Sequence, residues 1–322
     1  VSVVAVDSAT QNLSSQQDFS ADRVRSPIGV SYDTSSQKVV VAYKLNSNGY
    51  GYAVVGTVSG TSISFGTPVV FNSASALQIT TIYDANAQKH VIAYRNDGNS
   101  ARGTVIVGNV NGTSISFGTP VVFDSAGYSD YYSLTYDSNA QKVVLAFRDA
   151  GATNKGLAFV GTVNGTSISF GSSGEFESSS PQYISAVFDS GSNKVVIIFN
   201  DNSNSQYGTA VVGTVSGTNI SFGSQTVFQS SLIVYVSAAF DSTLNKIVVA
   251  YTDEGNSNRG TAIVGTVNGT AISFGSSSVF ATGNTTEVNI GYDPVAQKAI
   301  ITYTNDTLSN IGSLVPTTIS GT

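Results

Sequence analysis

The feature that most constrains the fold is an internal repeat of about 52 residues. In the 322-residue chain, six pairs of an aromatic residue followed by Asp recur at a regular spacing of 51 to 53 residues. The pairs are Tyr32-Asp33, Tyr83-Asp84, Tyr136-Asp137, Phe188-Asp189, Phe240-Asp241 and Tyr292-Asp293. Ile-Ser-Phe-Gly recurs five times and ends at Gly66, Gly118, Gly171, Gly223 and Gly275. Such a repeat predicts copies of one small unit that stack and bury a shared core.

Each repeat is predicted to form four β-strands, A to D, because its apolar runs are rich in Val, Ile, Thr and Phe. Strand A of the first repeat alternates, with Ile28, Val30 and Tyr32 on one face. Strand D of that repeat is expected as one strand over residues 62–71. Asn-Gly-Thr between strands C and D favours a type I′ hairpin, because Asn and Gly tolerate a positive φ. Between strands A and B, an Asp can accept hydrogen bonds from the turn, and a Lys five residues later can face it.

Four antiparallel strands per repeat are typical of a β-propeller blade. The sixth repeat has strands A to C but lacks strand D, whereas residues 3–9 resemble the end of a strand D, residues 120–126. We therefore expect an all-β fold: a six-bladed β-propeller of four-stranded antiparallel blades. The N-terminal strand would complete the last blade and close the ring. An open β-solenoid is the alternative.

This arrangement predicts a single domain over residues 1–322. Residues 1–9 would be the closing outer strand, residues 10–23 a polar insertion loop, and residues 24–322 the repeats. Because position 1 is Val rather than Met, we expect a processed form or a piece of a longer chain. No membrane insertion is expected, because no apolar run approaches the ~20 residues needed to cross a bilayer.

The repeats differ mainly at one end of the expected blades. The A–B and C–D turns are nearly constant, whereas the B–C and D–A loops differ in every copy. Loops on one face of a repeat array commonly bind ligands. The alternative is that these loops diverge freely and carry only solubilising charge. The candidate ligand-binding residues on this variable face are Tyr50, Arg95, Asp97, Arg102, Tyr128, Tyr131, Tyr132, Arg148, Asp149, Asp201, Tyr207, Asp253 and Arg259.

Composition excludes several classes of site. The chain has no Cys, so disulfides, thiolate metal sites and Cys nucleophiles are excluded. Its one histidine, His90, stands where other repeats have Val, which favours a buried or rim position over a catalytic one. The net charge of −6 disfavours nucleic-acid binding. We expect no cofactor. Calcium is conceivable at residues 96–99 or 253–256, although turn-forming Asn, Asp and Gly explain these strings without a metal.

The strings GTV[SN]GTSISFG and YDxxxQKVVxAY, which cover Pro27 to the C-terminus, resemble a repeat common in predicted structural proteins of marine bacteriophages. The resemblance implies a virion appendage, such as a tail fibre or tail-associated part, that contacts the host surface and other virion proteins. It implies no individual binding residues. If the same repeat belongs to a bacterial surface protein, the chain would be an adhesin.

These observations predict a non-enzymatic binding module at a virion surface or outside the cell. It would recognise a host-surface glycan or receptor through the variable face. A structural spacer or assembly module of a phage appendage is the first alternative. A propeller glycoside hydrolase is the second, with carboxylates drawn from several blades (Asp97, Asp201 and Asp253).

Overall fold

The computed structural model describes residues 2–5, 17–308 and 311–320. Within these residues the regular structure is β-strand, apart from three single 3-10 turns, η1 (Asp97–Asn99), η2 (Glu254–Asn256) and η3 (Asp306–Leu308). Neighbouring strands pair antiparallel, so the predicted all-β antiparallel class is confirmed. Among the described residues, no helix is long and apolar enough to span a membrane.

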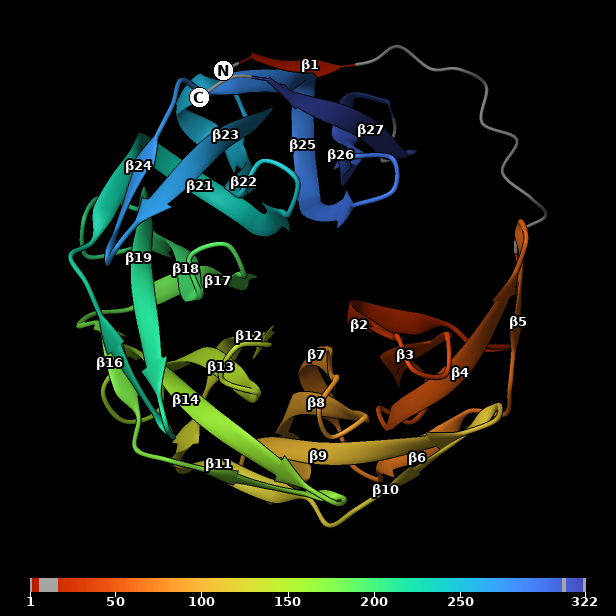
Figure 1. Ribbon diagram of the computed structural model, residues 1–322. Helices are drawn as coiled ribbons and strands as arrows, with labels where there is room; N and C mark the ends of the chain where they lie inside the picture. The colour runs from red at the N-terminus through yellow and green to blue at the C-terminus, as the bar shows by residue number, and fades with distance from the viewer. Residues whose placement is uncertain (1, 6–16, 309–310, 321–322) are drawn as a thin grey trace. The chain divides into compact units, whose positions relative to one another are not determined.

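The chain divides into two compact units. Thr10–Ser173 and Gly217–Asn219 form the first, called the N-terminal unit. Val1–Ala9, Gly174–Ser216 and Ile220–Thr322 form the second, called the C-terminal unit. Each unit consists of the predicted strand repeats, coloured red to yellow-green in the N-terminal unit and green to blue in most of the C-terminal unit (Figure 1).

The N-terminal unit contains three antiparallel sheets in which consecutive strands A, B and C lie side by side (Figure 1). The first sheet holds β2 (Val24–Asp33), β3 (Lys38–Leu45), β4 (Gly51–Ser59), β5 (Ser62–Phe65) and β6 (Val69–Asn72). The second holds β7 (Ala76–Asp84), β8 (Lys89–Asn96), β9 (Arg102–Asn111), β10 (Ser114–Phe117) and β11 (Val121–Tyr128). The third holds β12 (Asp130–Asp137), β13 (Lys142–Asp149), β14 (Lys155–Asn164) and β15 (Ser167–Phe170).

The C-terminal unit repeats the same pattern, but two long strands join its sheets. β21 and β25 each carry an outer strand directly into the innermost strand of the next repeat. The strands after residue 173 are β16 (Gly174–Glu177), β17 (Pro181–Asp189), β18 (Lys194–Asp201), β19 (Tyr207–Ser216), β20 (Asn219–Phe222), β21 (Thr226–Asp241), β22 (Lys246–Asp253), β23 (Arg259–Asn268), β24 (Ala271–Phe274), β25 (Ser278–Asp293), β26 (Lys298–Asn305) and β27 (Ile311–Ser320).

Strand D is broken in two, which corrects the expectation of one strand over residues 62–71. In the first repeat, β5 pairs with the second half of β4 and β6 pairs with its first half. The break falls at Gly66, where a Cβ would collide with the carbonyl of Thr113 in the hairpin of the next repeat. Three further Ile-Ser-Phe-Gly glycines meet the next hairpin in the same way: Gly118 at Thr166, Gly171 at Thr218 and Gly223 at Thr270. The two constant motifs are therefore the two sides of one contact between repeats.

The predicted hairpins are present, but the C–D turn is not type I′. Asn111 pairs with Ser114, and of the two loop residues only Gly112 has a positive φ, 62°.

The lysine of the A–B turn also has another partner. Asp33 accepts hydrogen bonds from the backbone N–H groups of Ser35 and Ser36, at 2.8 and 2.9 Å. Lys38 lies opposite Asp33 in the strand register. Its ammonium nevertheless donates to Thr57 on strand C, at 2.8 Å. The Asp therefore organises the turn while the Lys links strands B and C.

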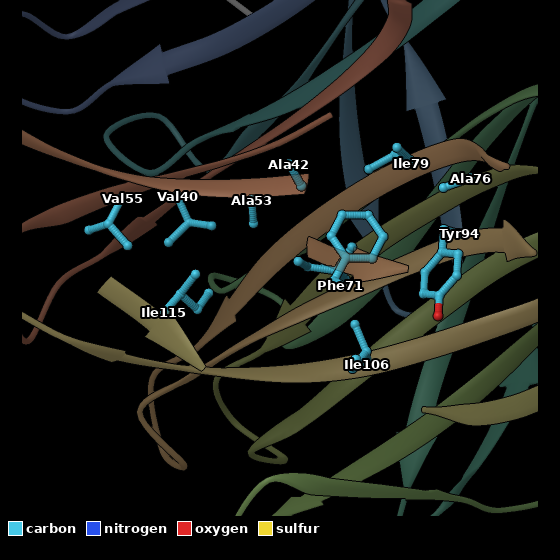
Figure 2. Packing of buried hydrophobic residues seen from close by; sticks show 11 residues of the cluster. Val40, Ala42, Ala53, Val55, Phe71, Ala76, Ile79, Tyr94, Ile106 and Ile115 are labelled. Atoms are coloured by element: carbon cyan, nitrogen blue, oxygen red, sulfur yellow. The ribbon is translucent and has the colours of Figure 1, made fainter. Parts of the chain in front are cut away.

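Strands B and C supply most of the core, because both of their faces are covered. Figure 2 shows the cluster at the first and second sheets, where Val40 and Val55 lie with Ile106 and Ile115. His90 is also buried, and its Nδ1 lies 2.8 Å from the hydroxyl of Ser31. The expectation of a buried histidine is confirmed.

The N-terminal strand β1 (Ser2–Ala5) pairs antiparallel with β27, the strand C of the last repeat. Ala5 lies opposite Thr317 and Ser2 opposite Ser320. In the first repeat, the same part of strand C pairs with β5, not with β6. β1 therefore stands in the place of the first half of an outer strand, whereas the sequence comparison had matched it to the second half.

Most of the expected insertion, residues 10–16, lies outside the described residues, as do residues 6–9. Residues 17–23 form no strand. They are not wholly polar in their contacts, because Phe19 packs edge-on against Tyr43 and Phe65.

Candidate functional site

The N-terminal unit brings five of the thirteen candidate residues together at the variable end of its second and third repeats. They come from the end of β8, the turn η1, the end of β11, the start of β12 and the end of β13. These strand ends lie together because each repeat has the same strand order, so that corresponding strands of neighbouring repeats end on the same side. The five are Arg95, Asp97, Tyr128, Tyr131 and Arg148.

Arg95 forms the first half of this cluster. Its guanidinium carbon lies 4.5 Å from the ring centre of Tyr128, and its Nε donates to Asp97 at 2.9 Å. Asp97 also accepts a hydrogen bond from Ser75, which in turn accepts one from the ammonium of Lys44 at 3.0 Å. Burial disfavours the charged guanidinium, but the hydrogen bond and charge of Asp97 outweigh it and raise the pKa of Arg95. The Arg95 side chain is thus charged and held in place.

Arg148 forms the second half. Its guanidinium carbon lies 4.9 Å from the ring centre of Tyr131. Two of its nitrogens donate to the two oxygens of Asp130, at 2.8 and 2.6 Å. The pKa of Arg148 is raised, because the hydrogen bonds and charge of Asp130 exceed the effect of burial. A two-point Arg–carboxylate contact fixes orientation as well as charge.

Tyr131 has a left-handed backbone, which a bulky residue adopts only at some cost in free energy. Its φ is 54°, and the register of β12 against β13 shifts between Asp130 and Ser133. Its N–H donates to the side chain of Gln78 at 3.3 Å. Residues five positions before every later aromatic–Asp pair share this conformation: Gln78, Tyr131, Tyr183, Tyr235 and Glu287. Tyr131 is therefore held rigidly at a bulge that recurs in the repeats.

Sequence analysis missed Tyr183 and Tyr235 in the C-terminal unit. Their ring centres lie 5.4 Å apart. Burial raises the pKa of Tyr235, and the charges of Glu287, Asp306 and Glu254 add to the effect. The constant offset from the aromatic–Asp pair was the signal that could have identified them. Residues 174–322 are acidic as a whole, with 10 acidic and four basic side chains, against 10 of each in residues 1–173.

The structure gives three candidate carboxylates roles inside their own loops. Asp149, Asp201 and Asp253 are all buried. Asp149 accepts from Ala152 N–H and the Thr153 hydroxyl. Asp201 accepts from the hydroxyl and N–H of Ser203 and from Asn204 N–H, and Asp253 accepts from Gln229 and Ser231. These side chains organise their loops: both oxygens of Asp149 and of Asp253 accept hydrogen bonds, and Asp201 accepts three through Oδ1.

Four other candidates share one repeat position, the residue before the first glycine of strand C. They are half-buried and lie at Tyr50, Arg102, Tyr207 and Arg259. Tyr132, the last candidate, is buried, and its hydroxyl lies 2.7 Å from that of Ser129. Burial raises its pKa. Tyr132 is therefore part of the core beneath the variable face.

Calcium was considered at residues 96–99 and 253–256. No group of three or more His, Cys, Asp or Glu that could hold a metal ion is found there or elsewhere among the described residues. Each string contains a single 3-10 turn, η1 or η2, and Asn96 accepts a hydrogen bond from Gly98 N–H at the start of η1.

Comparisons with known proteins give similarity of structure only. No protein-family model matches the chain, and no curated protein matches it. Solved structures do match. The SapL1 lectin in complex with α-methyl fucoside is 13% identical, with a TM-score of 0.54 over 93% of each chain. The Aleuria aurantia lectin, as a mutant in complex with Fucα1-6GlcNAc, is 11% identical, with a TM-score of 0.52 over 92% of this chain and 96% of that chain.

An enzyme is among the matches as well. The NanB sialidase of Streptococcus pneumoniae is 9% identical, with a TM-score of 0.59 over 97% of this chain and 70% of that one. These lectins and this sialidase are β-propeller proteins. The similarity therefore shows a fold of the β-propeller type, and at such low identity it shows the fold alone.

Proposed function

We propose that the chain is a carbohydrate-binding module without enzymatic activity, and that it binds through the variable end. The observation that carries the proposal is the pair of Arg–Tyr stacks, Arg95 with Tyr128 and Arg148 with Tyr131. Tyr rings offer a flat apolar surface to the C–H face of a sugar, while fixed guanidinium and carboxylate groups suit its hydroxyls. Because Asp97 and Asp130 already hold the arginines, little side-chain entropy is lost on binding. The structural similarity to lectins supports the same reading.

The ligand we propose is a glycan, or a glycosylated receptor, on a host cell surface. The protein would then act at a virion surface or outside the cell, together with other virion proteins. This part of the proposal rests on the resemblance of the repeat to bacteriophage structural proteins.

Binding is tested by glycan-array screening followed by calorimetry with the best glycan. We expect Arg148→Ala and Tyr131→Ala each to lower affinity at least about tenfold, the equivalent of about 1.4 kcal/mol. Lys142→Ala is the matched control, because Lys142 lies at the opposite end of the same strand, β13. Unchanged affinity in both site variants, or an equal loss in the control, would overturn the assignment.

A second candidate function, an assembly module, is favoured by apolar residues exposed along the outer strands. Val70, Val122, Val227 and Val279 occupy the same repeat position and are each exposed. An apolar rim of this kind fits a protein surface in a larger assembly. Analytical ultracentrifugation tests it: self-association at rising concentration supports this role, and a strict monomer argues against it.

We further propose that the six repeats form a closed six-bladed ring. The exposed strand-A face of the first repeat supports this. Ile28, Val30 and Tyr32 are 42%, 60% and 52% exposed, whereas Ile79 and Tyr83, their counterparts in the second repeat, are 3% and 6% exposed. The pairing of β1 with β27 also supports it, because it adds an outer element to the last repeat.

Paired cysteines test closure, and the chain has no native Cys to interfere. A Cβ at Gly29 would lie 3.1 Å from a methyl group of Thr81, so Gly29→Cys with Thr81→Cys is the positive control. The counterparts of these positions across the closing interface are Asn289 and Val30. We expect Asn289→Cys with Val30→Cys to form an intramolecular disulfide as readily as the control. Failure in this pair alone would argue against a closed ring.

A further inference from the structure

One aromatic contact recurs between consecutive repeats. The last Phe of an outer strand packs against aromatic rings of the following repeat. Phe71 lies 5.1 Å from Tyr94 and 6.0 Å from Phe117, between ring centres. The later repeats have corresponding contacts, edge-on or tilted, with two rings in three of them and one ring in the last: Phe123 with Phe147 and Phe170, Phe176 with Phe199 and Phe222, Phe228 with Tyr251 and Phe274, and Phe280 with Tyr303. We call this Phe the wedge and the two rings its socket.

The first repeat has the same socket, formed by Tyr43 and Phe65. No repeat precedes it in the sequence, yet the socket is filled. Phe19 lies 5.1 Å from Tyr43 at 65° and 5.9 Å from Phe65 at 62°. These values match the 5.1 Å at 60° and 6.0 Å at 66° of Phe71 in the next socket. The ring of Phe19 thus has the geometry of a wedge.

The spacing in the sequence agrees. Phe19 lies 13 residues before Tyr32, as Phe123 lies 13 residues before Tyr136. In the other repeats the distance from wedge to aromatic–Asp pair is 12 residues. Phe19 is therefore in register with the repeats, although it lies within residues that the sequence comparison had assigned to a polar insertion.

Neighbouring residues anchor the segment. The Ser20 hydroxyl donates to the carbonyl of Asp22 at 2.9 Å. The Asp22 N–H donates to the Ser20 hydroxyl at 3.2 Å, and the Asn46 N–H of the first repeat donates to the carbonyl of Arg23 at 2.8 Å. A surface pocket of about 380 Å³ lies between residues 18–22 and the first repeat, which contributes Tyr43, Leu45, Tyr52, Phe65, Gly66 and Pro68 to its lining. The segment is thus fixed by one ring and several hydrogen bonds over an apolar surface.

We propose that the Tyr43–Phe65 socket is a docking site for an aromatic side chain on an extended segment, and that residues 18–22 occupy it through Phe19. Phe19 of this segment fills the socket of the first repeat, as the last Phe of the preceding outer strand fills the socket of each later repeat. Its occupant comes from the same chain, so the socket of the first repeat is filled by the segment that precedes β2. The inference is independent of carbohydrate binding, since the socket does not include the Arg–Tyr cluster.

Tryptophan fluorescence tests this directly, because the chain has no native Trp. Phe19→Trp creates a single reporter. We expect blue-shifted emission and several-fold weaker acrylamide quenching than in Val58→Trp, whose site in the same repeat is 53% exposed. Emission and quenching equal to those of Val58→Trp would overturn the proposal.

A complementation experiment tests the docking itself. In the Phe19→Ala chain of residues 1–322, we expect the melting temperature to fall by on the order of 4 °C, since a partly buried ring is lost. A peptide of residues 15–25 should restore part of this loss, whereas the same peptide with Ala at position 19 should not. Equal effects of the two peptides would contradict an aromatic socket. If the Phe19→Trp chain forms a dimer and the protection of its Trp is lost when the dimer dissociates on dilution, the occupant comes from a second copy, and the assignment to the same chain is overturned.

Discussion

Arg148 and Asp130 form a two-point ion pair, with nitrogen–oxygen distances of 2.8 and 2.6 Å, and both side chains are largely removed from water. Arg95 and Asp97 make a similar but single contact at 2.9 Å, with the Asp97 side chain 33% exposed. The two pairs allow a matched comparison. A buried pair leaves an uncompensated charge when one partner is removed, whereas water replaces the lost partner at an exposed pair.

We therefore expect Asp130→Ala to lower the free energy of unfolding by about 3 kcal/mol. Asp97→Ala should lower it by less than about 1 kcal/mol. Urea denaturation of the two variants at one pH gives both values. Equal losses would mean that the Arg148–Asp130 pair is solvated, contrary to its burial.

The guanidinium plane of Arg148 should matter more for glycan binding than its charge. Arg148→Lys keeps the charge but loses the two-point contact with Asp130 and the flat stack on Tyr131. We expect it to lower glycan affinity nearly as much as Arg148→Ala, measured by calorimetry. Full affinity in Arg148→Lys would show that a point charge is enough.

His90 should make stability depend on pH. Burial lowers its pKa from 6.5 to about 4, while the nearby charge of Asp33 partly opposes the effect. The folded state thus favours the neutral ring, and the unfolded state takes up the proton first as the pH falls. The stabilisation is complete above about pH 6.5 and is lost progressively towards pH 4, by roughly 3 kcal/mol.

His90→Val is the matched variant, because Val39, Val143 and Val195 stand at the same position in other repeats. We expect it to remove this component of the loss between pH 6.5 and pH 4. At pH 7 it should cost little, since His90 Nε2 is buried without a hydrogen-bond partner among the described residues. Urea midpoints across this range measure both effects, and an unaltered pH profile would contradict the prediction.

Substitution by Gly at the left-handed bulge position should change stability in opposite directions in different repeats. Glu287 has a φ of 52° and an exposed side chain. Glu287→Gly should therefore raise stability by about 0.5–1 kcal/mol, because Gly adopts this φ without strain. Tyr235→Gly should lower stability, because its ring packs against the core of the last two repeats. Thermal melts compare them, with Glu287→Gln as the control for charge.

Much of the local structure followed from the sequence alone. The hydrophobic alternation gave the strands, Asn-Gly-Thr gave hairpins with positive φ at Gly112 and its counterparts, and the turn aspartates bond the N–H groups expected of them. These features depend on residues a few positions apart, so a single repeat contains all the information they need. The comparison of six copies also identified the end of the blades where Arg95, Tyr128, Tyr131 and Arg148 meet.

Contacts between distant residues decided the rest. Strand D breaks at Gly66 because a carbonyl from the next repeat, at Thr113, lies where a side chain would be. Asp149, Asp201 and Asp253 became loop-organising groups because their hydrogen-bond partners surround them once the loops fold. The wedge role of Phe19 was hidden because its partners, Tyr43 and Phe65, lie 24 and 46 residues away in sequence. Periodicity along the chain determines which residues form strands, whereas only packing in three dimensions determines which of them meet.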